Sequence, residues 1–244
     1  RLLPGLLIWS ISGSVRSLRH TTATQGWSSG VIVALLIVIV VGYGLDYLVT
    51  RLFKRIGRHI EQEIESSRKG DEAERRIVEI AQQTLDSDWT LFRNVALPTQ
   101  RKRKADIDIV LVGPPGIWVL EVKCLNGEYR NTGEQWEYRA GNTWKVMEKR
   151  NPTRQARNNA VHLAGFLRAD GIRQWVEPAV VWANPDATPA VQNPMVAVWP
   201  YERLADELGN LQRGRKLDEA TQAKVVEKLT ALCVAEAERQ KAEG

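Results

Sequence analysis

The stretch that most constrains the fold is 105–123, which reads ADIDIVLVGPPGIWVLEVK. Two β-branched apolar runs, 107–112 and 117–122, flank the GPPG of 113–116, and runs of this length bounded by Gly and Pro predict strands. So short a connection makes the two strands an antiparallel hairpin. Both runs are apolar nearly throughout, which predicts a hairpin in the middle of a sheet that is covered on both faces.

Charged residues lie at the open end of this hairpin. Asp106 and Asp108 begin the first strand, and Glu121 and Lys123 end the second. We expect Asp108, Glu121 and Lys123 to meet there, with Glu121 and Lys123 on the same face. Mg²⁺ takes one or two carboxylates, a backbone carbonyl and waters, and a nearby Lys can orient or deprotonate a bound water. The alternative is a set of solvated strand-end charges in which Glu121 and Lys123 form an ion pair.

The wider sequence resembles a known family. The hairpin, KGDEAERRIVEIAQQTL from Lys69, LFRNVALP from Leu91 and NPTRQARNNAVHL from Asn151 together resemble the nuclease-related domain (NERD) branch of the PD-(D/E)XK nuclease superfamily. The resemblance implies an α/β, restriction-endonuclease-like fold with a mixed central sheet flanked by helices. It also implies Mg²⁺-dependent hydrolysis of nucleic-acid phosphodiester bonds, with Mn²⁺ as an alternative metal and DNA favoured over RNA. One departure is Ile109, where the family commonly has His.

The resemblance also implies residue roles. The catalytic residues would be Asp108, Glu121, Lys123 and Gln155, and the metal ligands would be Glu74, Asp108, Glu121 and the carbonyl of Val122. Lys123 would position or activate the attacking water, and Gln155 would orient a water or a phosphate. From the residues alone, Glu74 is equally an acidic residue favoured by the helix dipole, and Gln155 is equally an exposed helical residue. The rival function is a catalytically idle domain that binds nucleic acid or acts as a membrane-tethered scaffold.

The chain before this region predicts a membrane anchor. Residues 27–45 form an uncharged apolar run of membrane-spanning length, and we expect a transmembrane helix over 27–49. The basic residues just after position 50 place the rest of the chain in the cytoplasm, at the inner membrane. Residues 1–26 form a segment with an apolar part followed by a polar part. Whether 2–15 belong to a second membrane segment is left open by the sequence. Residues 50–69 read as a charged helical stalk that ends at Gly70.

Two further domain segments follow the stalk. The nuclease-like core spans 70–186, and 187–244 add a strand and helices that complete the domain. Within them we expect helices at 71–85, 201–208 and 218–241, a helix N-capped by Asn151, a second hairpin over 136–148, and strands at 89–97, 176–183 and 195–199.

Charge and metal-binding residues limit the classes of function. The net charge of +5 belongs to the segment before Gly70, since acidic and basic residues balance from there on, so overall charge does not indicate nucleic-acid binding. Locally, a basic strip could contact a phosphate backbone; its members are Arg101, Lys102, Arg103, Lys104 and Arg154. The two cysteines and three histidines are scattered, which makes a zinc site improbable and suggests reduced thiols.

Overall fold

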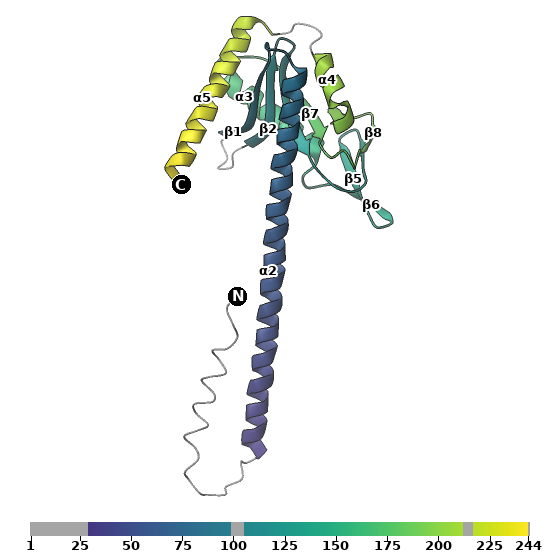
Figure 1. The fold of residues 1–244 in the computed structure, drawn as a ribbon, viewed down its shortest axis with the longest axis vertical. Helices are drawn as coiled ribbons and strands as arrows, with labels where there is room; N and C mark the ends of the chain where they lie inside the picture. The colour runs from purple at the N-terminus through teal and green to yellow at the C-terminus, as the bar shows by residue number, and fades with distance from the viewer. Residues whose placement is uncertain (1–28, 99–104, 212–216, 244) are drawn as a thin grey trace. The chain divides into compact units, whose positions relative to one another are not determined.

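The structure, a computed structural model, describes residues 29–98, 105–211 and 217–243. They belong to two compact units, Arg1–Glu61 and Gln62–Gly244. Figure 1 shows their elements, which are α2 (Ser29–Thr84), β1 (Thr90–Leu97), β2 (Ala105–Gly113), β3 (Gly116–Lys123), β4 (Tyr129–Thr132), β5 (Gln135–Ala140), β6 (Thr143–Val146), α3 (Pro152–Arg168), β7 (Val176–Trp182), β8 (Ala190–Gln192), β9 (Ala197–Pro200), the 3₁₀ turn η1 (Tyr201–Arg203), α4 (Leu204–Leu211) and α5 (Glu219–Glu243).

The first unit is described from Ser29 onward, where it is helical. In the part of the chain that the structure describes, no helix is both long enough and apolar enough to cross a membrane. The predicted transmembrane helix over 27–49 is therefore not supported, and the segment 1–26 lies outside the described residues. Gly70 does not end a helix as predicted, because it lies inside α2.

A five-stranded sheet with the order β1-β2-β3-β7-β9 forms the centre of the second unit. β1, β2 and β3 are antiparallel neighbours, whereas β7 pairs parallel with both β3 and β9. The predicted hairpin is present, with Gly113 opposite Gly116 at its turn. A side chain at Gly113 would collide with the ring of Trp89, 2.3 Å from the position of its Cβ. The mixed α/β fold that the sequence predicts is confirmed.

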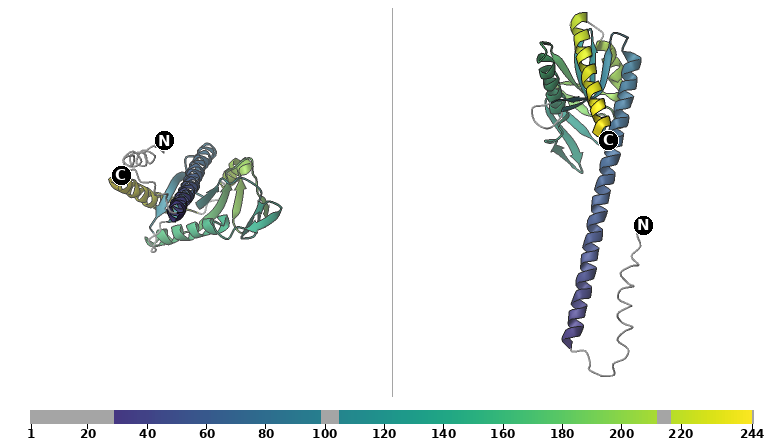
Figure 2. Two further views of the ribbon diagram at one scale, coloured as in Figure 1. Left: turned by 90° about the horizontal axis from the view of Figure 1, so that it is seen from below. Right: turned by 90° about the vertical axis from the view of Figure 1, so that its left-hand side faces the viewer.

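Helices cover both faces of this sheet, as predicted for a hairpin that is apolar on both sides. On one face, Ile107, Val110 and Val119 pack with residues of α3 and α5, including Leu163 and Val225. On the other face, strand residues pack with α2 and α4; the buried members of that cluster include Ala73, Ile77, Ile109, Leu111, Leu120, Val122, Leu204 and Leu208. Figure 2 shows α3 and α4 on opposite sides of the sheet. Because both faces of the central strands are buried, polar side chains of these strands lie near the strand ends.

A second, four-stranded sheet with the order β6-β5-β4-β8 includes the predicted second hairpin. β4, β5 and β6 lie in the connection between β3 and α3. Trp136 of β5 stacks on Trp182 of β7 with ring centroids 5.4 Å apart, and its Nε1 donates to Thr153 Oγ1 at 2.8 Å. Asn184 donates to the carbonyl of Leu125 at 2.9 Å. These contacts fix the small sheet against the end of β7 and the beginning of α3.

The beginning of α3 is capped as predicted. Asn151 is buried, and its Oδ1 accepts from the backbone N–H of Arg154 at 3.0 Å, while Pro152 occupies the first turn. Asn151 Nδ2 also donates to the carbonyl of Glu134 at 2.9 Å. The side chain therefore both starts the helix and holds the turn between β4 and β5, which fixes the position of the residues that follow on α3.

Candidate active site

The main sheet is irregular at Asp108. The β1–β2 register pairs Arg93 with Ile109 and Val95 with Ile107 but skips Asn94 and Asp108 between them, and Asn94 has a positive φ of 54°. Ile107 and Ile109 consequently pack on opposite faces, although residues two apart in a regular strand share a face. The Asp108 carboxylate instead accepts from the backbone N–H of Val122 at 2.7 Å. The irregularity therefore holds this carboxylate against the main chain of β3.

Glu121 and Lys123 share the face of β3 that is covered by α3. Lys123 Nζ lies 2.5 Å from Glu121 Oε1, so the ion pair of the alternative interpretation is present. The pair is not solvated, however, since Glu121 is only 3% exposed. Asn159 of α3 donates from Nδ2 to the other oxygen, Glu121 Oε2, at 3.1 Å. Both oxygens of Glu121 are thus held by donors in this structure.

Burial makes the two carboxyl groups hold protons more tightly than usual. Loss of solvation, together with the neighbouring Asp108 carboxylate, raises the pKa of Glu121 to about 7 against the opposing attraction of Lys123. Loss of solvation likewise raises the pKa of Asp108, although the N–H of Val122 and the charge of Lys123 oppose this. Two carboxyl groups whose charge is disfavoured in this way form a site that a cation would stabilise.

Glu74 lies on α2, the helix that covers the opposite face of the sheet. Its Oε2 accepts from Arg93 Nε at 3.1 Å, and Arg93 also contacts Asp71 Oδ1 at 3.3 Å. Loss of solvation raises the pKa of Glu74, with a smaller contribution from Asp108. Across the described residues there is no group of three or more His, Cys, Asp or Glu side chains placed to hold a metal ion. The three predicted acidic ligands are therefore not assembled into one cluster.

The donor set of Asp108 and Glu121 nevertheless fits a hard divalent cation. Mg²⁺ is commonly held by one or two carboxylates, with waters filling its other positions. Gln155 Oε1 on α3 is buried without a hydrogen-bond partner among the described residues. Gln155 lies one helical turn before Asn159, so both amides project from the same side of α3.

Asn159 is a site residue that sequence reasoning missed. The only signal in the sequence is its spacing of four residues from Gln155, which places the two on one face of a helix. That signal does not identify Glu121 as the partner, because the contact joins residues 38 positions apart.

The predicted phosphate contacts are described only in part. Arg101, Lys102, Arg103 and Lys104 lie outside the described residues. The side chain of Arg154 is 58% exposed, and its Nε lies 3.4 Å from Glu134 Oε1. This exposed pair leaves Arg154 accessible to solvent but partly neutralised.

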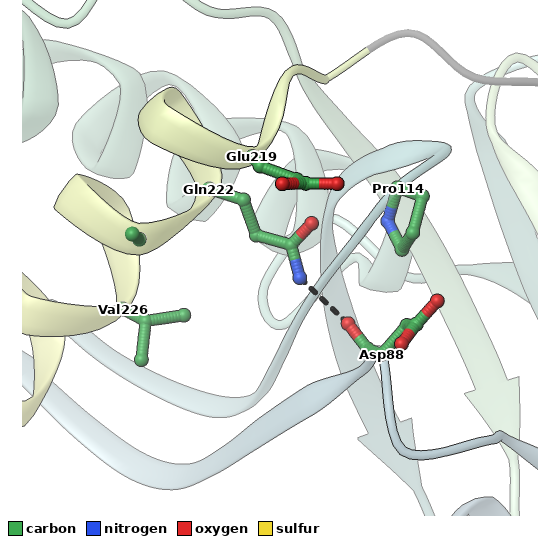
Figure 3. Close-up of a pocket in the computed structure, with 6 residues that line it drawn as sticks. Asp88, Pro114, Glu219, Gln222 and Val226 are labelled. Carbon is green, nitrogen blue, oxygen red and sulfur yellow. Dashed lines mark hydrogen bonds between the residues drawn. The ribbon is translucent and has the colours of Figure 1, made fainter.

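A pocket of about 280 Å³ lies elsewhere, near the turn of the central hairpin (Figure 3). It is lined by Asp88, Pro114, Glu219, Gln222, Ala223 and Val226, and Gln222 Nε2 donates to the carbonyl of Asp88 at 2.6 Å. Because Pro114 is at the turn and Asp108 and Glu121 are at the other end of the strands, this pocket is separate from the carboxylate site.

Comparison with known proteins gives one family match. The family model described as the nuclease-related domain matches residues 69–183, which confirms the resemblance drawn from the motifs. The match includes Glu74, Asp108, Glu121, Lys123, Gln155 and Asn159. No curated protein and no solved structure matches the chain.

Proposed function

Residues 69–183 belong to the nuclease-related domain family, and from this premise we propose that the protein is a metal-dependent nuclease. The reaction is hydrolysis of a nucleic-acid phosphodiester bond, with DNA as the favoured substrate and Mg²⁺, or Mn²⁺ in its place, as the metal. The observation that carries this proposal is the pair of carboxyl groups, buried Glu121 and half-buried Asp108, beside Lys123 at the end of the central strands.

Asp108 and Glu121 would hold the metal, together with the carbonyl of Val122. A bound Mg²⁺ would supply Lewis-acid polarisation of the phosphate and a more acidic water. Asn159 keeps Glu121 in position through its hydrogen bond to Oε2. Gln155, whose buried Oε1 has no partner among the described residues, would accept a hydrogen bond from the attacking water.

Lys123 would stabilise charge and position the water. Its side chain is only 17% exposed, so its charge acts in a medium that screens less well than bulk water. A fixed cation near a phosphoryl group that gains negative charge lowers the barrier to hydrolysis. Its ion pair with Glu121 gives the ammonium a defined position before substrate arrives.

Glu74 would be a third metal ligand, by analogy with the family. To act so, its carboxylate must exchange the guanidinium of Arg93 for the metal. The Glu74–Arg93 pair, and the presence of buried Ile109 where the family commonly has His, favour the second candidate function, a catalytically idle domain that binds nucleic acid or serves as a scaffold. The inner-membrane location with a cytoplasmic domain stays a prediction of the sequence.

The deciding experiment uses the full chain with single-stranded, duplex and branched DNA and with RNA, in Mg²⁺, Mn²⁺ or EDTA. Lys123→Ala tests the site, and Lys149→Ala, which removes an exposed Lys, is the matched control. We expect metal-dependent cleavage that is lost only in Lys123→Ala. Binding without cleavage would favour the idle domain. The absence of both binding and cleavage would refute both proposals.

A further inference from the structure

The outer face of the small sheet combines aromatic and basic side chains. Trp136 of β5 and Asn131 of β4 point inward and are fully buried. Strand alternation places the neighbouring positions on the other side. We call that side the outer face, and its members include Arg130, Glu137, Arg139 and Trp144.

Two arginines lie on the ring of Trp144. The guanidinium carbon of Arg130 is 4.5 Å from the ring centroid and that of Arg139 is 5.5 Å from it. Such contacts hold a guanidinium in a defined orientation. The two arginines are therefore ordered on an exposed surface rather than extended freely into solvent.

The outer face keeps a positive charge. Arg130 is partly neutralised, because its Nε lies 2.5 Å from Glu137 Oε2. Arg139 donates from Nε to a neutral acceptor, the carbonyl of Gly141, at 3.0 Å. In the described parts of the chain, no ion pair involves Arg139. An anionic partner would thus meet at least one guanidinium whose charge is not countered by a carboxylate.

The outer face belongs to a sheet that is built next to the carboxylate site. The chain passes from Lys123 at the end of β3 directly into β4. Trp136 is bonded to Thr153 at the beginning of α3, the helix that carries Gln155 and Asn159. Figure 1 shows β5 and β6 projecting from the side of the main sheet. The small sheet is therefore anchored to the same elements, β3 and α3, that carry the carboxylate site.

We propose that the outer face binds single-stranded nucleic acid and that the bound strand continues to the site at the end of β3. This inference rests on the proposed nuclease function and specifies its substrate. Bases that are not paired stack on aromatic rings and on guanidinium planes, whereas the paired bases of a duplex offer no free face. The phosphates between them are attracted by Arg139 and Arg130.

The sharpest test compares two variants on one hairpin. Arg139→Gln and Lys145→Gln each remove one positive charge, but Arg139 pairs with Trp144 whereas Lys145 pairs with Tyr138 on the other face. Anisotropy of a labelled single-stranded oligonucleotide in EDTA measures binding to the full chain. We expect Arg139→Gln to weaken binding and to reduce the slope of log K against log salt by about 0.7. Equal effects of the two variants would overturn the proposal.

Trp144 provides the second test. Trp144→Ala should weaken binding of the single strand roughly 5- to 150-fold, the range for loss of one stacked base, and Trp144→Phe should restore much of it. Circular dichroism checks that each variant is folded. Unchanged binding by folded Trp144→Ala, a preference of the wild-type chain for duplex, or no binding to any single strand would each refute the proposal.

Cleavage and binding separate this inference from the proposed function. Because binding is measured without metal, it does not depend on catalysis. If the wild-type chain cleaves and the Arg139→Gln and Trp144→Ala variants bind as well as it does, the nuclease function is supported and binding at the outer face is refuted. If both variants lose binding and the wild-type chain does not cleave, binding at the outer face is supported and the nuclease function is refuted.

Discussion

Replacing Glu121 with Gln tests whether the carboxylate site is strained at neutral pH. The pKa of Glu121 is about 7 in the folded protein against 4.5 for an ordinary Glu. Because the folded-state pKa is raised, the protonated group stabilises the fold fully below about pH 4.5. This stabilisation is lost as the pH rises through 7.

The magnitude follows from the two pKa values. At about 1.4 kcal/mol per pKa unit, the difference corresponds to about 3 kcal/mol in the free energy of unfolding. Solvent screening reduces this little, because the Glu121 side chain is 4% exposed. Gln mimics the protonated acid but leaves Lys123 without its nearest partner, although Asp108 still attracts it. We therefore expect Glu121→Gln to be about 1–3 kcal/mol more stable than wild type at pH 8 and nearly equal to it at pH 5.

The assay is urea unfolding of the full chain in EDTA between pH 5 and pH 8.5, followed by tryptophan fluorescence. The difference between variant and wild type at each pH isolates Glu121 from other titrating groups. Glu128→Gln, which changes an exposed Glu, is the matched control. A Glu121→Gln variant that is less stable than wild type at pH 8, or a difference that does not vary with pH, would refute the reasoning.

Three further predictions concern the same site. Mg²⁺ should raise the melting temperature of the wild type more at pH 8 than at pH 6, because protons compete for the carboxylates, and the rise should vanish in Asp108→Asn when measured by differential scanning fluorimetry. Asn159→Ala should weaken Mg²⁺ binding and lower kcat about tenfold or more, since Glu121 loses its fixed orientation. Asn158→Ala, on the exposed side of α3, should change neither quantity. Calorimetric titration and cleavage rates measure both variants, and equal effects would contradict the prediction. Arg93→Gln should strengthen Mg²⁺ binding by releasing Glu74, and a weaker or unchanged affinity in the same titration would show that Glu74 is not a ligand.

Local patterns predicted the centre of the fold because local geometry determines it. The short GPPG turn fixes the register of β2 and β3, and that register alone brings Asp108, Glu121 and Lys123 to one end of the sheet. The cap at Asn151 is equally local, since the side chain contacts a backbone N–H three residues on. In both places the interacting groups are close in sequence or are tied by a tight turn.

The features that sequence reasoning missed depend on distant contacts. The break in strand alternation at Asp108 accompanies a positive φ at Asn94 on the neighbouring strand, and nothing in β2 itself signals it. The pairing of Glu74 with Arg93 joins a helix to a strand that packs against it. Gly70 was predicted to interrupt a helix, but glycine weakens a helix by only about 1 kcal/mol, which packing on one side overcomes.

The placement of the small sheet has a consequence for how such a protein diversifies. β3 and β7 are adjacent parallel strands, and β4, β5 and β6 occupy the crossover that joins them. The pairing of β3 with β7, extended by the hydrogen bond from Ala183 N to Lys123 O at 2.8 Å, does not depend on the outward-facing side chains of that crossover. Substitutions on the exposed strands can therefore alter what the domain recognises while the carboxylates and the lysine keep their geometry, so that recognition and chemistry are free to evolve separately.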